Sequence, residues 1–208
     1  RQNIEQMLRN EGYLHATVDL ECKKDPVKRR AEATYYLHER ERYYISDVRL
    51  NTEDKGIEEI VMADSLSSLL RTGMPFSVDG LESERRRITA MLRNKGYYRF
   101  RKEYITYIAD TAQFSNDVRL TMNIALFTPS SDAQPEEHSR YHINDIYFVS
   151  GAGLNIDSVE LAQCDTMVFG DYRILHRGDP VLRPRLLANN TYLERGRMYS
   201  LNDAEMTH

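Results

Sequence analysis

The sequence predicts an α+β fold built from tandem βααββ units, in which two helices pack on a small mixed three-stranded sheet. Two repeats within the 208 residues carry this prediction. The stretch 7–13, MLRNEGY, returns at 91–97 as MLRNKGY, and the stretch 42–50, RYYISDVRL, is matched at 140–148 by RYHINDIYF. Two families of matches in one consistent order indicate repeated structural units.

The first repeat is predicted to be the last turn of an amphipathic helix. In its second copy, Ile88, Met91 and Leu92 recur with helical spacing. Gly12 and Gly96 follow directly, and glycine just past a helix is typical of a left-handed stop. The repeated letters therefore mark a helix end and the aromatic residue that leaves it.

Two strands are predicted after each of these helices. The segments 15–22 and 99–108 are rich in Tyr, Ile, Val and Thr and alternate in polarity. After a polar loop, the segments 31–37 and 118–124 place apolar residues at every second position. Each unit thus ends in the order helix, strand, strand.

The second repeat is predicted to be the strand that begins a unit. After 42–50 comes an apolar helical pattern over 57–70 that stops at Gly73. The connector 73–82, GMPFSVDGLE, leads into the second helix and has a counterpart at 196–205, GRMYSLNDAE.

Three modules follow from this phasing. Residues 1–40 hold the C-terminal half of one module, 41–130 a complete module, and 140–208 the N-terminal part of a third, expanded one. The strands at 42 and 140 are 98 residues apart, whereas the connectors at 73 and 196 are 123 apart. Extra residues are therefore expected within about 149–185.

The composition argues against nucleic acid as a partner. Twenty-eight basic and 32 acidic residues give a formal charge of -4, whereas phosphate binding needs a concentrated basic surface. No apolar run approaches the roughly 20 residues of a membrane-spanning helix. The two cysteines, Cys22 and Cys164, are expected to be free thiols in different modules.

No motif predicts catalysis, a cofactor or a metal. GAG at 151–153 lacks the third glycine of a dinucleotide-binding turn, and His38-Glu39 lacks the second histidine of a zinc-protease motif. The three residues of the run Arg85-Arg86-Arg87 point about 100 degrees apart on a helix and cannot form one face, so the run is interpreted as solvated surface. The sequence predicts that the protein is not an enzyme.

The tandem units resemble polypeptide-transport-associated (POTRA) domains, which form the periplasmic arm of outer-membrane assembly proteins of the BamA and TamA type. The matching positions are Tyr43, Ile45, Val48, Gly73, Phe76, Leu92, Gly96 and Tyr97 in the complete module, and Tyr141, Ile143, Ile146, Gly196 and Tyr199 in the third. The resemblance implies a periplasmic scaffold attached to the bacterial outer membrane. It also implies three kinds of partner: unfolded outer-membrane proteins, subunits of an assembly complex, and a C-terminal membrane β-barrel of the same protein.

Two alternatives stay open. A KH-type nucleic-acid-binding module has a similar order of elements, but it needs a Gly-x-x-Gly loop that the connector 73–82 lacks. The chain is also compatible with the POTRA arm of a different secretion or cell-division protein.

The resemblance further implies where clients bind. In POTRA modules the second strand lies at a sheet edge, which maps here to 100–108. An edge can bind unfolded chains by β-augmentation, because it pairs with backbone groups that every chain has. The client-binding residues predicted on this strand are Phe100, Tyr104, Ile105, Thr106, Tyr107 and Ile108. Proline at Thr106 is expected to remove a donor from the edge, and the alternative is that a neighbouring module covers the edge.

Overall fold

The computed structural model describes residues 1–208 except 27, 112–115, 131, 151–162, 179–182 and 208. The described residues divide into two compact units. The first contains Arg1–Thr89 and Arg101–Glu137, and the second contains Ala90–Phe100 and His138–His208.

The first unit contains elements in the order strand, helix, helix, strand, strand, although residues 90–94 at the end of the second helix belong to the second unit. Strand β3 (Tyr44–Thr52) lies parallel to β5 (Asp117–Ile124), and β4 (Ile105–Thr111) lies antiparallel to β5. The strand order is therefore β3-β5-β4, which confirms the predicted mixed three-stranded sheet. The elements between β3 and β4 are α2 (Lys55–Ala63), the 3-10 turn η1 (Ser65–Ser67), α3 (Val78–Asn94, of which residues 78–89 belong to this unit) and the 3-10 turn η2 (Lys102–Tyr104).

The central strand β5 carries the apolar face of the sheet. Its alternate residues Val118, Leu120, Met122 and Ile124 are all buried, as its period-two pattern predicts. Leu120 and Val118 pack in one cluster with apolar residues from β3 and from the segments on either side of Gly73. Burial of each such side chain stabilises the fold by about 1.5–3 kcal/mol.

Helix α2 has a strong start signal. The Asp54 carboxylate is buried and accepts a hydrogen bond from the Ile57 backbone N–H at 3.0 Å. Such an N-cap satisfies a backbone donor that the helix itself leaves unpaired, and it contributes about 1 kcal/mol.

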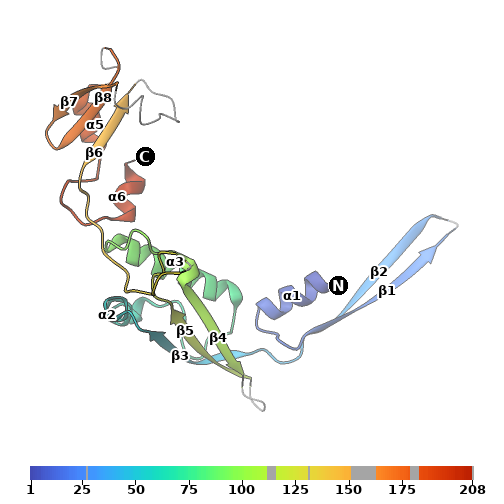
Figure 1. Ribbon diagram of the computed structural model, residues 1–208. Helices are drawn as coiled ribbons and strands as arrows, with labels where there is room; N and C mark the ends of the chain where they lie inside the picture. The colour runs from blue at the N-terminus through green and yellow to red at the C-terminus, as the bar shows by residue number, and fades with distance from the viewer. Residues whose placement is uncertain (27, 112–115, 131, 151–162, 179–182, 208) are drawn as a thin grey trace. The chain divides into compact units, whose positions relative to one another are not determined.

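The N-terminal segment of the first unit has the predicted order helix, strand, strand. Helix α1 (Gln2–Asn10) precedes β1 (Thr17–Asp25) and β2 (Arg30–His38), which pair as an antiparallel hairpin (Figure 1). A small core forms where α1 meets the start of β1, from Leu8, Ala16 and Val18. The Glu5 carboxylate secures this contact, because it accepts a hydrogen bond from the Val18 N–H at 3.0 Å.

The second unit has a sheet of the same topology. Strand β6 (Ile146–Ser150) lies parallel to β8 (Tyr172–His176), which pairs antiparallel with β7 (Asp165–Phe169), so the order is β6-β8-β7. Two short helices follow, α5 (Pro184–Asn189) and α6 (Leu201–Met206).

The sequence did not predict β7 and β8. For residues 140–208 it predicted one strand followed by helices, with extra residues of no assigned structure within about 149–185. Both strands lie inside that segment and complete a three-stranded sheet with β6. They have no counterpart in the internal repeat, so the repeat phasing carried no information about them.

Candidate interaction surface

Strand β4 lies at the edge of the sheet of the complete module. It pairs with β5 on one side, from Ile105 opposite Ile124 to Thr111 opposite Val118. In the described part of the chain no strand pairs with its other side. The predicted second strand is therefore an edge strand, although whether it binds a client is a separate question.

The strand begins later than predicted. Phe100 is almost fully buried, and its N–H donates to the Tyr97 carbonyl in a turn at 2.9 Å. Tyr104 belongs to η2, where its N–H donates to Arg101 at 3.2 Å. Ile105, Thr106, Tyr107 and Ile108 lie on β4, whereas Phe100 and Tyr104 lie before it. The aromatic content of 99–104 favoured a strand. Instead, the backbone N–H groups of Phe100 and Tyr104 form hydrogen bonds within local turns.

The backbone directions of β4 show which residues present donors at the open edge. The Ala125 N–H donates to the Tyr104 carbonyl at 2.9 Å, so Tyr104 directs its carbonyl toward β5. Because these directions alternate along an antiparallel strand, Thr106 and Ile108 also face β5 with their N–H groups. Ile105, Tyr107 and Ala109 face outward. The expectation for proline at Thr106 was therefore wrong, since that donor belongs to the internal ladder.

The side chains of β4 divide between the two faces of the sheet. Ile105 is buried, and Tyr107 packs against the core cluster around Leu120. Burial raises the pKa of the Tyr107 hydroxyl well above its ordinary value. Thr106 and Ile108 are exposed on the opposite face. A guest strand would therefore meet the backbone of Tyr107 rather than its ring.

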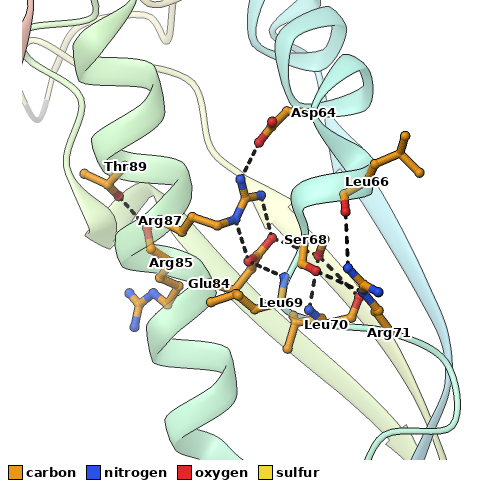
Figure 2. Close-up of polar contacts among 10 residues, drawn as sticks. All are labelled: Asp64, Leu66, Ser68, Leu69, Leu70, Arg71, Glu84, Arg85, Arg87 and Thr89. Atoms are coloured by element: carbon orange, nitrogen blue, oxygen red, sulfur yellow. Dashed lines mark hydrogen bonds and ion pairs between the residues drawn. The ribbon is translucent and has the colours of Figure 1, made fainter.

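A buried carboxylate lies on α3 beneath the segment that follows η1 (Figure 2). Glu84 is only 2% exposed, and it accepts hydrogen bonds from the Ser68 hydroxyl and the Leu69 N–H, both at 2.9 Å. Arg87 donates to the same carboxylate through Nε and Nη2 at 2.9 Å and also binds Asp64. Burial by itself raises the pKa of Glu84, but the hydrogen bonds from Arg87, Leu69 and Ser68 outweigh it and lower that pKa. This network holds the segment 64–70 against α3.

The arginine run was interpreted as solvated surface, and the structure corrects this for Arg87. Its side chain is 22% exposed and lies in the Glu84 network, whereas the Arg86 side chain is 71% exposed. Arg85 has an intermediate position, since it binds Glu82 at 3.0 Å and donates to the Lys102 carbonyl at 3.0 Å. Consecutive helix residues point in different directions, so the three arginines have three different environments.

A cavity of about 180 Å³ adjoins this network. Its walls combine apolar side chains from β3, α2 and β5, such as Val48, Val61 and Met122, with the polar groups of Glu84 and Arg87. The polar groups are already paired with one another, so the cavity offers no unpaired charge to a ligand.

The two sequence repeats meet in space. In the first unit the Gly12 carbonyl accepts from the Tyr43 N–H at 2.9 Å, and the Tyr43 carbonyl accepts from the Phe76 N–H at 2.9 Å. The Arg42 guanidinium lies over the Tyr13 ring at 5.5 Å. We call this contact the entry joint, because it ties a glycine helix stop to the strand and connector of the next module.

The second unit contains the same joint. The Gly96 carbonyl accepts from the Tyr141 N–H at 2.8 Å, and the Tyr141 carbonyl accepts from the Tyr199 N–H at 2.8 Å. Arg140 lies over the Tyr97 ring at 5.3 Å. Both glycines have the predicted left-handed backbone, with φ of +96° and +95°. Both repeats are visible in the sequence, and their fixed order along the chain is a signal of this contact, but the sequence alone did not predict that they bind each other.

The described residues offer few other candidates for a metal site or a catalytic site. The described residues contain no group of three or more side chains suited to a metal ion, and none of their helices has the length and apolar content to cross a bilayer. His38 ends β2 and is exposed beside Asp19, at 3.2 Å. The glycines of 151–153 lie outside the described residues.

The βααββ order with strand order β3-β5-β4 is the fold of a POTRA domain. The chain is similar to POTRA domains 3–5 of BamA from Haemophilus influenzae, with a TM-score of 0.53 and 15% identity over 99% of this chain and 64% of that chain. At this identity the likeness establishes the POTRA fold. The chain spans about two thirds of the length of that structure.

Two further solved structures are similar at lower TM-scores. BamA from Haemophilus ducreyi lacking POTRA domains 1–3 gives 0.39 at 20% identity, covering 59% of this chain and 21% of that chain. POTRA domains 1–3 of the periplasmic domain of Omp85 from Anabaena give 0.30 at 10% identity, covering 99% and 66%. No family model and no curated protein matches the sequence.

Proposed function

We propose that the chain is part of a periplasmic scaffold of an outer-membrane protein assembly or translocation factor, attached to the outer membrane. It binds unfolded outer-membrane proteins or partner subunits by β-augmentation at β4. The observation that carries this proposal is the open outer edge of β4 in a sheet with the POTRA order.

The chemistry of an edge suits varied clients. Unfolded chains differ in their side chains, but each presents the same backbone donors and acceptors. The outward backbone groups of Ile105, Tyr107 and Ala109 offer a matching row, and each added hydrogen bond contributes about 0.5–1.5 kcal/mol. Affinity then depends little on client sequence, as a scaffold for many clients requires.

The start of the strand is fixed in place. Lys102 Nζ binds the Glu82 carboxylate at 2.8 Å, and Arg85 donates to the Lys102 carbonyl. Both partners lie on α3, so η2 is tied to the helix layer. A rigid edge loses little conformational entropy when a guest strand binds.

The test uses the full chain and a fluorescein-labelled peptide of about ten residues with the alternating pattern of an outer-membrane barrel strand. Fluorescence anisotropy gives the affinity, and hydrogen exchange locates the protected amides. The variant is Ala109→Pro, which removes an outward donor and inserts a ring at an exposed position of the edge. Its matched control is Ala109→Thr, which keeps the donor and favours extended structure.

We expect Ala109→Pro to weaken peptide binding by about fivefold or more, because about 1 kcal/mol of hydrogen bonding is lost and the ring obstructs the guest strand. Ala109→Thr should bind as the unchanged chain does, with protection of the outward amides of β4. Equal affinity in a folded Ala109→Pro variant would show that clients bind elsewhere.

A further inference from the structure

The two entry joints share their backbone contacts but differ in one charge. In the first joint the residue before the glycine stop is Glu11, whereas the repeat places Lys95 at the same position in the second. The arginine that precedes the next strand is the same in both copies, Arg42 in the first and Arg140 in the second. The same contact therefore carries a carboxylate in one copy and an ammonium group in the other.

In the first joint the carboxylate pairs with the arginine. Arg42 Nη2 lies 3.4 Å from Glu11 Oε2, and Arg42 Nε donates to the Glu11 carbonyl at 2.9 Å. The guanidinium keeps this pair while it lies over the Tyr13 ring. The pair is partly exposed, so it stabilises the fold only slightly, but it balances the charge of the arginine.

In the second joint no carboxylate takes the place of Glu11. Arg140 lies over the Tyr97 ring at 5.3 Å, and its Cβ lies next to Gly96. In the described part of the chain, no ion pair involves Arg140 or Lys95. Both side chains are exposed. Two cations therefore lie where the first joint has a balanced pair.

Further cations and an exposed ring surround this place. Arg99 lies over the Tyr141 ring at 5.5 Å. Arg93, on the last turn of α3, donates to the Tyr199 hydroxyl at 3.3 Å. The Tyr98 ring makes edge contacts with the rings of Tyr141 and Tyr199, at 5.9 and 4.9 Å, but is 52% exposed. Because the whole chain has a formal charge of -4, this cationic surface is a local exception.

We propose that the second joint binds an acidic segment of a partner protein. A carboxylate of that segment takes the place that Glu11 has in the first joint and pairs with Arg140, while a neighbouring side chain of the segment packs on Tyr98. We call this surface the cationic joint, and it consists of Arg93, Lys95, Tyr98, Arg99 and Arg140. It is separate from β4 and does not depend on the function proposed for that edge.

The first joint indicates the chemistry of the occupant. Arg42 binds a carboxylate while it lies over a tyrosine ring, and Arg140 has the same position over its own ring. A peptide uses both the cations and the exposed Tyr98 ring, whereas a phosphate ion uses the cations alone. Tyrosine and arginine are also enriched among the residues that dominate protein–protein binding. Opposite charge on the partner accelerates its association with such a surface.

The probe is a rhodamine-labelled peptide in which glutamate alternates with tyrosine, added to the full chain, and anisotropy gives its affinity. The same peptide with glutamine in place of glutamate is its control. The variant Lys95→Glu supplies the carboxylate from the chain itself, as Glu11 does in the first copy. Lys55→Glu makes the same charge change at an exposed position in the first turn of α2, where a carboxylate is well tolerated, and is the matched control. The reciprocal variant Glu11→Lys gives the first joint the charges of the second.

We expect the glutamine peptide to bind about tenfold or more weakly than the glutamate peptide. Lys95→Glu should weaken binding by about tenfold or more, because its carboxylate competes for Arg140, whereas Lys55→Glu and Ala109→Pro should bind as the unchanged chain does. Glu11→Lys should add a second site of similar affinity.

Four outcomes would overturn the proposal. They are no binding at about millimolar glutamate peptide, equal binding of the two peptides, equal loss in Lys95→Glu and Lys55→Glu, and no added site in Glu11→Lys. Tighter binding of inorganic phosphate, or of vesicles with an acidic lipid, than of the peptide would also overturn it, because the occupant would then be a phosphate group.

Discussion

Replacing Gly12 by alanine is expected to open the entry joint of the first unit. Gly12 has φ of +96°, which costs an L-residue about 1–2 kcal/mol. The added Cβ would lie 2.5 Å from the Phe76 carbonyl oxygen and 3.4 Å from that of Tyr43. Both are backbone atoms and cannot rotate away, so overpacking adds about 1–3 kcal/mol. We expect a total of about 3 kcal/mol, or about a hundredfold in the opening equilibrium.

The amide of Tyr43 reports this change directly, because it donates to the Gly12 carbonyl at 2.9 Å. Hydrogen exchange at that amide should accelerate by about a hundredfold under conditions where exchange follows the opening equilibrium. Gly73→Ala is the matched control: its φ is +85°, but a Cβ there meets nothing within 4 Å. Gly73→Ala should lower the free energy of unfolding only by the about 1–2 kcal/mol that a left-handed backbone costs an L-residue. If the two variants lose the same free energy of unfolding, or if Tyr43 exchange does not change in Gly12→Ala, the close-approach argument is refuted.

Three further predictions concern the complete module. Because the folded-state pKa of Glu84 is lowered from 4.5, its stabilisation is present above that pH and is lost as pH falls through the folded value. In urea titrations, the free energy of unfolding should therefore fall less from neutral to acidic pH for Glu84→Gln than for the unchanged chain. Arg87→Ala should cost about 2–3 kcal/mol because it removes the positive charge that pairs with a buried carboxylate, whereas Arg86→Ala on the exposed side should stay within about 0.5 kcal/mol. Thr106→Pro breaks the ladder to β5 and should lower the free energy of unfolding by about 3 kcal/mol. Ala109→Pro at the open edge should cost much less, and equal losses in urea titrations would contradict the assigned backbone directions.

The sequence by itself determined the kinds of element and their order in the complete module. Alternation over 118–124 and helical spacing around Ile88 reflect which side chains lie on one face of a strand or helix, and that depends only on local geometry. Gly12 and Gly96 marked helix ends for the same reason, since a left-handed backbone is a property of one residue. These local signals recurred in a consistent order, and the resemblance to POTRA domains rested on that recurrence.

The tertiary structure decided what depends on residues far apart in the chain. It showed that the two repeats form one joint, that Arg87 is drawn into a buried network by Asp64 and Glu84, and that β4 begins at Ile105. Which amides of β4 face outward followed from a single hydrogen bond, which the Ala125 N–H donates to the Tyr104 carbonyl. Period and composition do not encode such facts, because edge position, register and the burial of a charge are set by partners brought close only when the chain folds.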